Sequence, residues 1–197
     1  MPSRKAAPSR ELRNQIVVAV LAATLGALFG LIGALLTERR KTAEDLERIR
    51  SEIILRIEER SAETAVVLGK MIVTADFALQ GRASGSSQSE VASVSQKFKE
   101  LHFQLQGTAW QWPWYIVEEA RTHRLLGNPA LEKLKNAAAA YIENLKKEVE
   151  LAWTLHAFCI APRPEPRRIA DVKSELLRVQ AGERESLEAM KTVLRQQ

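Results

Sequence analysis

The sequence predicts an all-α protein, in which one N-terminal transmembrane helix is followed by an antiparallel four-helix bundle with one broken helix. Three observations support this prediction. The composition is rich in Ala, Leu, Glu, Lys and Arg, and the 197 residues include only 9 Gly and 7 Pro, which favours helices. A long run without charges lies near the N-terminus. The rest of the chain shows apolar residues at helical spacing between clear breaks.

The charge-free run covers residues 16–36 and follows a basic tail, residues 1–14. As a helix the run is roughly 31 Å long, close to the thickness of a hydrocarbon core. A cleaved signal peptide is the main alternative, but its apolar region is shorter, about 7–15 residues, and leads to an A-x-A-like site. We therefore expect a retained transmembrane helix over residues 15–37, a bundle domain over residues 38–197, and a single-pass location in a bacterial-type inner or plasma membrane.

The basic residues on the two sides of the span are nearly equal in number, so they give little preference for either orientation. They are Arg4, Lys5, Arg10 and Arg13 before the span, and Arg39, Arg40, Lys41, Arg48 and Arg50 after it. The positive-inside rule therefore separates the two orientations only weakly. Moving a short basic tail across the membrane is unfavourable, which favours a cytosolic N-terminus.

Small residues form a stripe along one face of the predicted span, namely Ala19, Ala23, Gly26, Gly30 and Gly33. The stripe includes a Gly-x-x-x-Gly motif, which lets two helices approach closely in lipid. Gly and Ala are common in membrane helices in any case. If the stripe does pack against another helix, that helix belongs to a second copy or to another membrane protein, and the sequence does not distinguish these two partners. Beyond the span, the positions that continue the spacing of the stripe carry polar residues. Two helices therefore do not continue to pack along this face as a simple parallel coiled coil.

Four helical regions follow the span, at about residues 42–80, 88–126, 129–160 and 166–195. The second region is interrupted, because Gly107 weakens the helix and Pro113 suits the first turn of a new one. It is therefore expected as two pieces, at about 88–106 and 113–126. Laid end to end, the pieces match the other helices in length. The economical arrangement is a bundle of four antiparallel members, of which the second is broken.

Three of the four tryptophans, Trp110, Trp112 and Trp114, alternate around a proline at this break, and Tyr115 follows them. In an upright bundle the break lies roughly 30 Å from the bilayer, too far for an aromatic belt at the headgroups. Two interpretations stay open: indole rings that fill the core where a helix is broken, or a ligand or partner site. In an extended strip the three indoles lie on one side and Gln111 on the other.

No motif in the sequence points to an enzyme, a cofactor or a metal. Di-iron bundles need Glu-x-x-His pairs, which are absent, and the Glu119–His123 spacing occurs often by chance. Lys70 and Asp76 interrupt an apolar segment but stand six residues apart, so they do not face each other along one helix. Cys159 is the only cysteine, which excludes an intrachain disulfide. We expect no catalytic group, no metal and no cofactor.

Charge and motifs together favour an interaction protein. The net charge is +5, but residues 37–197 carry 25 basic and 23 acidic side chains, a near balance that disfavours nucleic-acid binding. We expect a non-enzymatic, membrane-anchored interaction or scaffold module, oligomeric or part of a membrane complex. Its partners are then the lipid bilayer and a second copy or another membrane protein. The alternative is a sensory module that binds a small molecule at the tryptophan break, residues 107–116.

Overall fold

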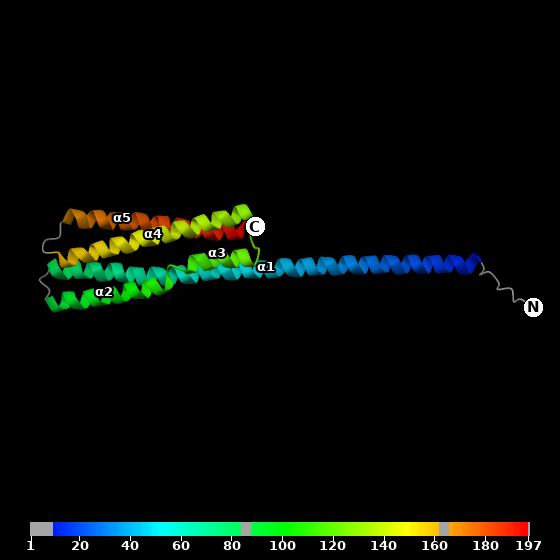
Figure 1. Cartoon of the computed structure of the whole chain (residues 1–197), viewed down its shortest axis with the longest axis horizontal. Helices are drawn as coiled ribbons and strands as arrows, with labels where there is room; N and C mark the ends of the chain where they lie inside the picture. Colours follow the sequence, from blue (N-terminus) through cyan, green and yellow to red (C-terminus); the bar gives the residue numbers. More distant parts are fainter. Residues whose placement is uncertain (1–9, 84–87, 162–165, 197) are drawn as a thin grey trace, which may run out of the picture. The chain divides into compact units, whose positions relative to one another are not determined.

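The computed structural model describes the backbone of residues 10–83, 88–161 and 166–196, and the side chains of these ranges except 10–29, 82–83, 88, 108 and 159–160. It contains the helices α1 (Arg10–Ala83), α2 (Gln88–Thr108), α3 (Trp112–Thr122), α4 (Asn128–Ile160) and α5 (Pro166–Arg195) (Figure 1). No strand occurs within the described ranges. The predicted all-α class is confirmed.

Helix α1 runs without a break through residues 37–42, where the sequence predicted that one helix ends and the next begins. Local contacts support the continuous helix. Arg40 Nε lies 3.0 Å from Glu44 Oε1, and the Thr37 hydroxyl donates to the carbonyl of Gly33 at 2.8 Å. No Gly or Pro interrupts this stretch, so nothing in the sequence ends the helix there. The chain divides into the units Met1–Glu47 and Arg48–Gln197, which are described separately.

The predicted transmembrane helix, residues 15–37, lies for the most part outside the residues whose side chains are described, which begin at Gly30. The members of the small-residue stripe that lie outside them are Ala19, Ala23 and Gly26. Among the residues with described side chains, no helical segment is both long and apolar enough to cross a membrane. At Gly30 and Gly33, an added Cβ would meet no atom within 4 Å.

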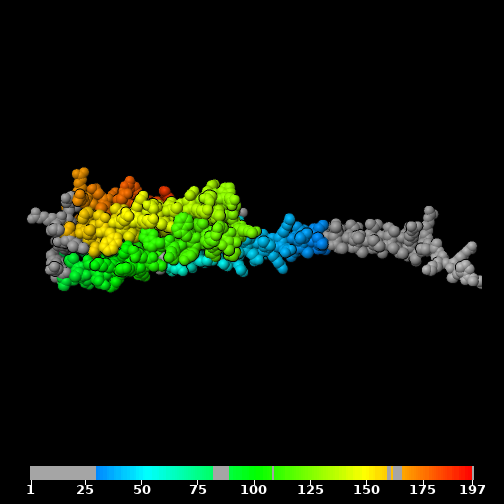
Figure 2. All heavy atoms as spheres, in the orientation of Figure 1, coloured from blue at the N-terminus to red at the C-terminus, as the bar shows by residue number. Residues whose placement is uncertain are grey.

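The unit Arg48–Gln197 is a helical bundle, as predicted. Its members are the second part of α1, the pair α2 and α3 placed end to end, α4, and α5 (Figure 1). Successive members run in opposite directions, because each connection returns the chain alongside the helix before it. On the face shown in Figure 2, α4 lies between α5 and the α2–α3 pair. The sequence therefore identified both the number of members and the broken one.

The core of the bundle is made by the apolar stripes of its helices. Helix α4 contributes the most fully buried side chains, namely Leu134, Ala138, Tyr141, Leu145, Ala152 and Leu155. The other helices supply Ile53, Ile57, Met71, Ala75, Phe98, Leu105, Met190 and Leu194. These residues recur at spacings of three, four and seven, which place them on one face of each helix. Burial of large side chains of this kind contributes roughly 1.5–3 kcal/mol each.

Helix α3 ends at Thr122, earlier than the predicted end at about residue 126. Arg124 takes the left-handed conformation, with φ of 52°, and so turns the chain. The amide of Leu125 then donates to the carbonyl of Ala120 at 3.0 Å. This turn buries Leu125 and Leu126 against the bundle. Burial of these two side chains explains why the helix ends before the glycine that the sequence suggested as its end.

Candidate functional site

The predicted tryptophan strip is a tight turn followed by a helix, and not an extended segment. Residues 109–111 form the turn between α2 and α3, and Trp112 is the first residue of α3. The amide of Ala109 still donates to the carbonyl of Leu105, and that of Trp114 donates to the carbonyl of Gln111. The helical pattern therefore resumes almost at once, and the break is shorter than the predicted one.

Helical geometry separates the tryptophans instead of gathering them on one face. Residues two apart on a helix point in nearly opposite directions, since each residue turns the chain by about 100°. Trp112 is accordingly buried, with 5% of its surface exposed, whereas Trp114 is 48% exposed. Tyr115 is exposed and Trp110 is half-buried. The expectation that three indoles share one side is wrong, because it depended on an extended strip.

Trp112, the first residue of α3, is buried in the bundle next to the break. Its ring lies 5.0 Å from the ring of Tyr141 of α4, at an angle of 59°. Among the described atoms, the Trp112 Nε1 has no hydrogen-bond partner. Buried polar atoms without partners are uncommon in proteins. The role of the tryptophan strip as a ligand or partner site stays a prediction.

Two histidines and the fourth tryptophan form a second cluster, between α2 and α4. His156 stacks on Phe98 with ring centroids 4.4 Å apart, and Trp153 Nε1 donates to His102 Nδ1 at 3.4 Å. Burial lowers the pKa of both histidines, and the charge of Lys99 lowers that of His156 further. Neutral imidazoles suit a packed aromatic layer.

His156 also faces a hydroxyl, since Ser95 Oγ lies 2.8 Å from His156 Nε2. A nucleophilic serine normally needs a histidine that is itself oriented by a third group. Within the described part of the chain, no carboxylate forms a hydrogen bond or ion pair with His156. The pair therefore joins α2 to α4 as a structural contact.

A buried pair of carboxyl groups lies between α4 and α5. Glu148 of α4 is 2% exposed and Glu183 of α5 is also buried. Gln180 Nε2 donates to Glu148 Oε1 at 2.7 Å, whereas Glu148 Oε2 has no hydrogen-bond partner among the described atoms. Burial, and then the neighbouring Glu183 carboxyl, raises the pKa of Glu148 to about 8. The pair is thus favoured in a state that keeps a proton.

Tyr141 lies between the glutamate pair and the tryptophan break, because it interacts with Glu183 and its ring also contacts Trp112. Burial, and then the charge of Glu183, raises the pKa of the Tyr141 hydroxyl. Neither Glu148 nor Glu183 is among the residues predicted from the sequence. A signal for both exists, however, since Glu148 lies seven residues after the buried Tyr141 and Glu183 lies seven residues before the buried Met190. Charged residues in phase with an apolar stripe indicate burial.

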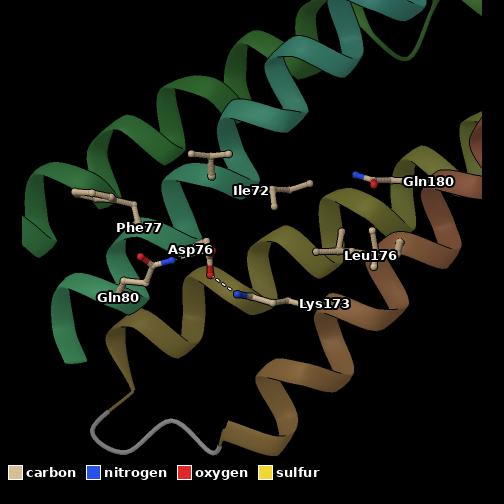
Figure 3. A pocket seen from close by; sticks show the side chains of 9 residues that line it. Ile72, Asp76, Phe77, Gln80, Lys173, Leu176 and Gln180 are labelled. Carbon is tan, nitrogen blue, oxygen red and sulfur yellow. Dashed lines mark hydrogen bonds and ion pairs between the residues drawn. The ribbon is translucent and has the colours of Figure 1, made fainter. Parts of the chain in front are cut away.

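An apolar groove lies between α1 and α5, with a volume of about 390 Å³ (Figure 3). Its walls include Ile72, Val73 and Phe77 of α1 and Leu176 and Leu177 of α5. Three of these side chains are large, apolar and exposed: Val73 at 67%, Phe77 at 69% and Leu177 at 71%. We call this surface the α1–α5 groove.

One ion pair crosses the α1–α5 groove. Lys173 Nζ lies 2.5 Å from Asp76 Oδ1, as the dashed line in Figure 3 shows. Asp76 was noted in the sequence as a charge within an apolar segment, and its partner is this lysine of α5. Lys70, the other charge of that segment, is exposed. The groove is therefore apolar and electrically neutral.

The remaining candidates from the sequence do not form a metal centre in the described residues. Glu119 Oε2 accepts a hydrogen bond from Arg56 Nη1 at 2.8 Å, and His123 is exposed. The side chain of Cys159 lies outside the described residues. Within the described part, no group of three or more His, Cys, Asp or Glu side chains is placed to hold a metal ion.

The chain matches no protein-family model, no curated protein and no solved structure.

Proposed function

We propose that the chain is a single-pass membrane-anchored helical bundle that acts as an interaction or scaffold module and assembles with further copies of itself or within a membrane complex. The observation that supports this most directly is the set of large apolar side chains exposed along the α1–α5 groove. Contiguous exposed apolar surface marks an interaction site in a soluble domain.

The membrane anchor is the N-terminal part of the proposal. Residues 16–36 carry no charge over roughly 31 Å of helix, and the basic tail before them favours a cytosolic N-terminus. Within the described residues, Leu31, Leu35 and Leu36 are exposed large apolar side chains. A hydrocarbon environment or a partner helix would cover them, and the stripe from Ala19 to Gly33 offers the surface for the second case.

A second copy is the occupant that best fits the α1–α5 groove. Copies anchored in one membrane meet at a raised effective concentration. A two-fold interface brings the same patch from both copies together, so an apolar patch meets an apolar patch. The ion pair between Asp76 and Lys173 leaves the groove neutral, so two grooves that face each other do not repel.

Charges introduced into the groove test this assignment. We expect the double change Val73→Glu and Phe77→Glu to weaken self-association of the full chain about a hundredfold or more, because two unpaired carboxylates would be desolvated in the interface. Sedimentation equilibrium in a density-matched detergent measures the dissociation constant. Phe103→Glu is the matched control, since Phe103 is equally exposed but lies on α2. Equal affinity of wild type and double variant would show that the groove is not the interface.

A ligand-binding sensory module is the second candidate. The observation that favours it is the buried Trp112, whose indole nitrogen has no hydrogen-bond partner among the described atoms. A small molecule with an acceptor group beside the break would supply that partner. Tryptophan emission of the full chain, compared between wild type and Trp112→Phe during titration with metabolites and lipids, tests this. An unchanged emission throughout such a panel would exclude the tryptophan break as the binding site.

A further inference from the structure

The buried pair of glutamates lines a cavity of about 340 Å³ between α1, α4 and α5. Glu148 comes from α4 and Glu183 from α5, and α1 forms the opposite wall. A cavity of this size falls in the range of small-molecule sites. This cavity lies within one chain, so a ligand could occupy it whether or not the protein self-associates.

Small residues of α1 make the space. Ala62, Ala65 and Gly69 recur at spacings of three and four, so they face the cavity from one side of the helix. A Cβ added at Gly69 would meet no atom within 4 Å. Leu68 and Leu187 complete the apolar part of the wall. The lining is therefore partly apolar, and Ser61, Gln180 and Arg184 join the two glutamates in its polar part. The cavity is open to solvent, since Ala62, Ala65 and Arg184 are exposed.

The acidic end contains a buried carboxyl oxygen that receives no donor from any side chain other than the neighbouring carboxyl group of Glu183. Glu148 is almost fully buried, and its Oε2 has no hydrogen-bond partner among the described atoms, although Gln180 donates to Oε1. Leaving a buried acceptor of this kind without a donor carries a free-energy penalty. A donor that enters the cavity would remove this penalty. Arg184, the only basic residue in the lining, is an exposed side chain.

The chemistry of the lining selects the kind of donor. Two carboxyl groups attract a cation, but zinc and calcium sites generally need three or more protein ligands, and no such group exists in the described residues. A cation that brings its own N–H donors can take the place of the proton that the pair keeps, whereas an uncharged donor cannot. We propose that this cavity binds a small primary ammonium ion, whose N–H groups donate to Glu148 and Glu183 while its hydrocarbon part lies against Leu68 and Leu187.

The test is isothermal titration of the full chain in detergent with n-butylammonium chloride. We expect saturable binding, and no saturable binding of n-butanol, which lacks the charge, or of tetramethylammonium, which lacks the N–H donors. Glu148→Gln removes the acidic acceptor and Gly69→Leu fills the cavity. Each is expected to weaken binding at least about tenfold, because the first removes a charge-assisted hydrogen bond and the second occupies the space of the hydrocarbon part. Glu185→Gln, an exposed change on α5, is the control with wild-type affinity.

Several results would overturn the proposal. They are the absence of saturable butylammonium binding to the wild type, equal binding of n-butanol, binding of magnesium in preference to the ammonium ion, and wild-type affinity in both cavity variants. Misfolding does not obscure the test, because the two cavity variants act differently. One replaces a buried acid by its amide, and the other replaces a helical glycine by a good helix former. Circular dichroism of both variants checks that the helices are retained.

Discussion

Replacing Phe98 by alanine is expected to lower the free energy of unfolding by about 3–5 kcal/mol, the range for a large aromatic side chain deleted from a core. Phe98 is fully buried in α2. Its ring stacks on His156 and meets Trp153 edge-on, with centroids 4.9 Å apart. The change therefore leaves a cavity in the aromatic layer that joins α2 to α4. Urea unfolding of the full chain in detergent, followed by circular dichroism, measures the loss.

Phe103 provides the control for this prediction, because it is the same residue type on the same helix but 70% exposed. Phe103→Ala is expected to change stability by no more than about 0.5 kcal/mol. Similar stability losses in the two variants would mean that α2 does not bury Phe98 against α4.

The buried glutamate pair is expected to make stability fall as pH rises. The pKa of Glu148 is about 8 in the folded chain and 4.5 in its ordinary state. Between these values the folded chain keeps a proton that the unfolded chain releases, so raising the pH favours unfolding, by up to about 1.4 kcal/mol per pH unit. Below about 4.5 both states are protonated and above about 8 neither is, so the slope from this group is confined to that window.

Glu148→Gln is expected to remove this slope, and the variant is expected to be more stable than wild type at mildly alkaline pH. The charged groups around Glu148 are Glu183, which raises its pKa, and Arg184, which lowers it; Gln180 also donates to it. Denaturant unfolding at a series of pH values measures the effect. Glu150→Gln, an exposed change on the same helix, should keep the wild-type slope. A wild-type slope in Glu148→Gln would show that another group causes it.

The bundle could be predicted because its signals are local. Apolar residues at helical spacing identify each helix, and Pro113 and Gly107 mark the broken member. The helix ends were less predictable, because Arg124 takes a left-handed conformation that a sequence suggests for glycine. Burial of Leu125 and Leu126 decides that turn, and burial depends on tertiary contacts.

The candidate sites were harder to predict than the fold. Alternating tryptophans suggested an extended strip, but the helical turn that begins at Trp112 places Trp112 and Trp114 on opposite faces. The glutamate pair could not be predicted from the sequence, because Glu148 and Glu183 lie on different helices, 35 positions apart in the chain. Only the packing of α4 against α5 brings them together. The apolar phase of each helix indicates their burial, but not which residue each one faces.

Native mass spectrometry of the full chain, extracted gently with detergent, tests the proposed function most directly. The protomer has a mass of 22.1 kDa. A membrane-anchored assembling module predicts a whole-number multiple of this mass or a complex with another membrane protein. It also predicts a smaller assembly when Gly26→Leu and Gly30→Leu are combined, because leucine side chains keep two helices apart. Val17→Leu with Thr24→Leu adds bulk on the face opposite the stripe and should leave the assembly unchanged. A single protomer in the wild type, or an unchanged assembly in the glycine variant, would contradict this account.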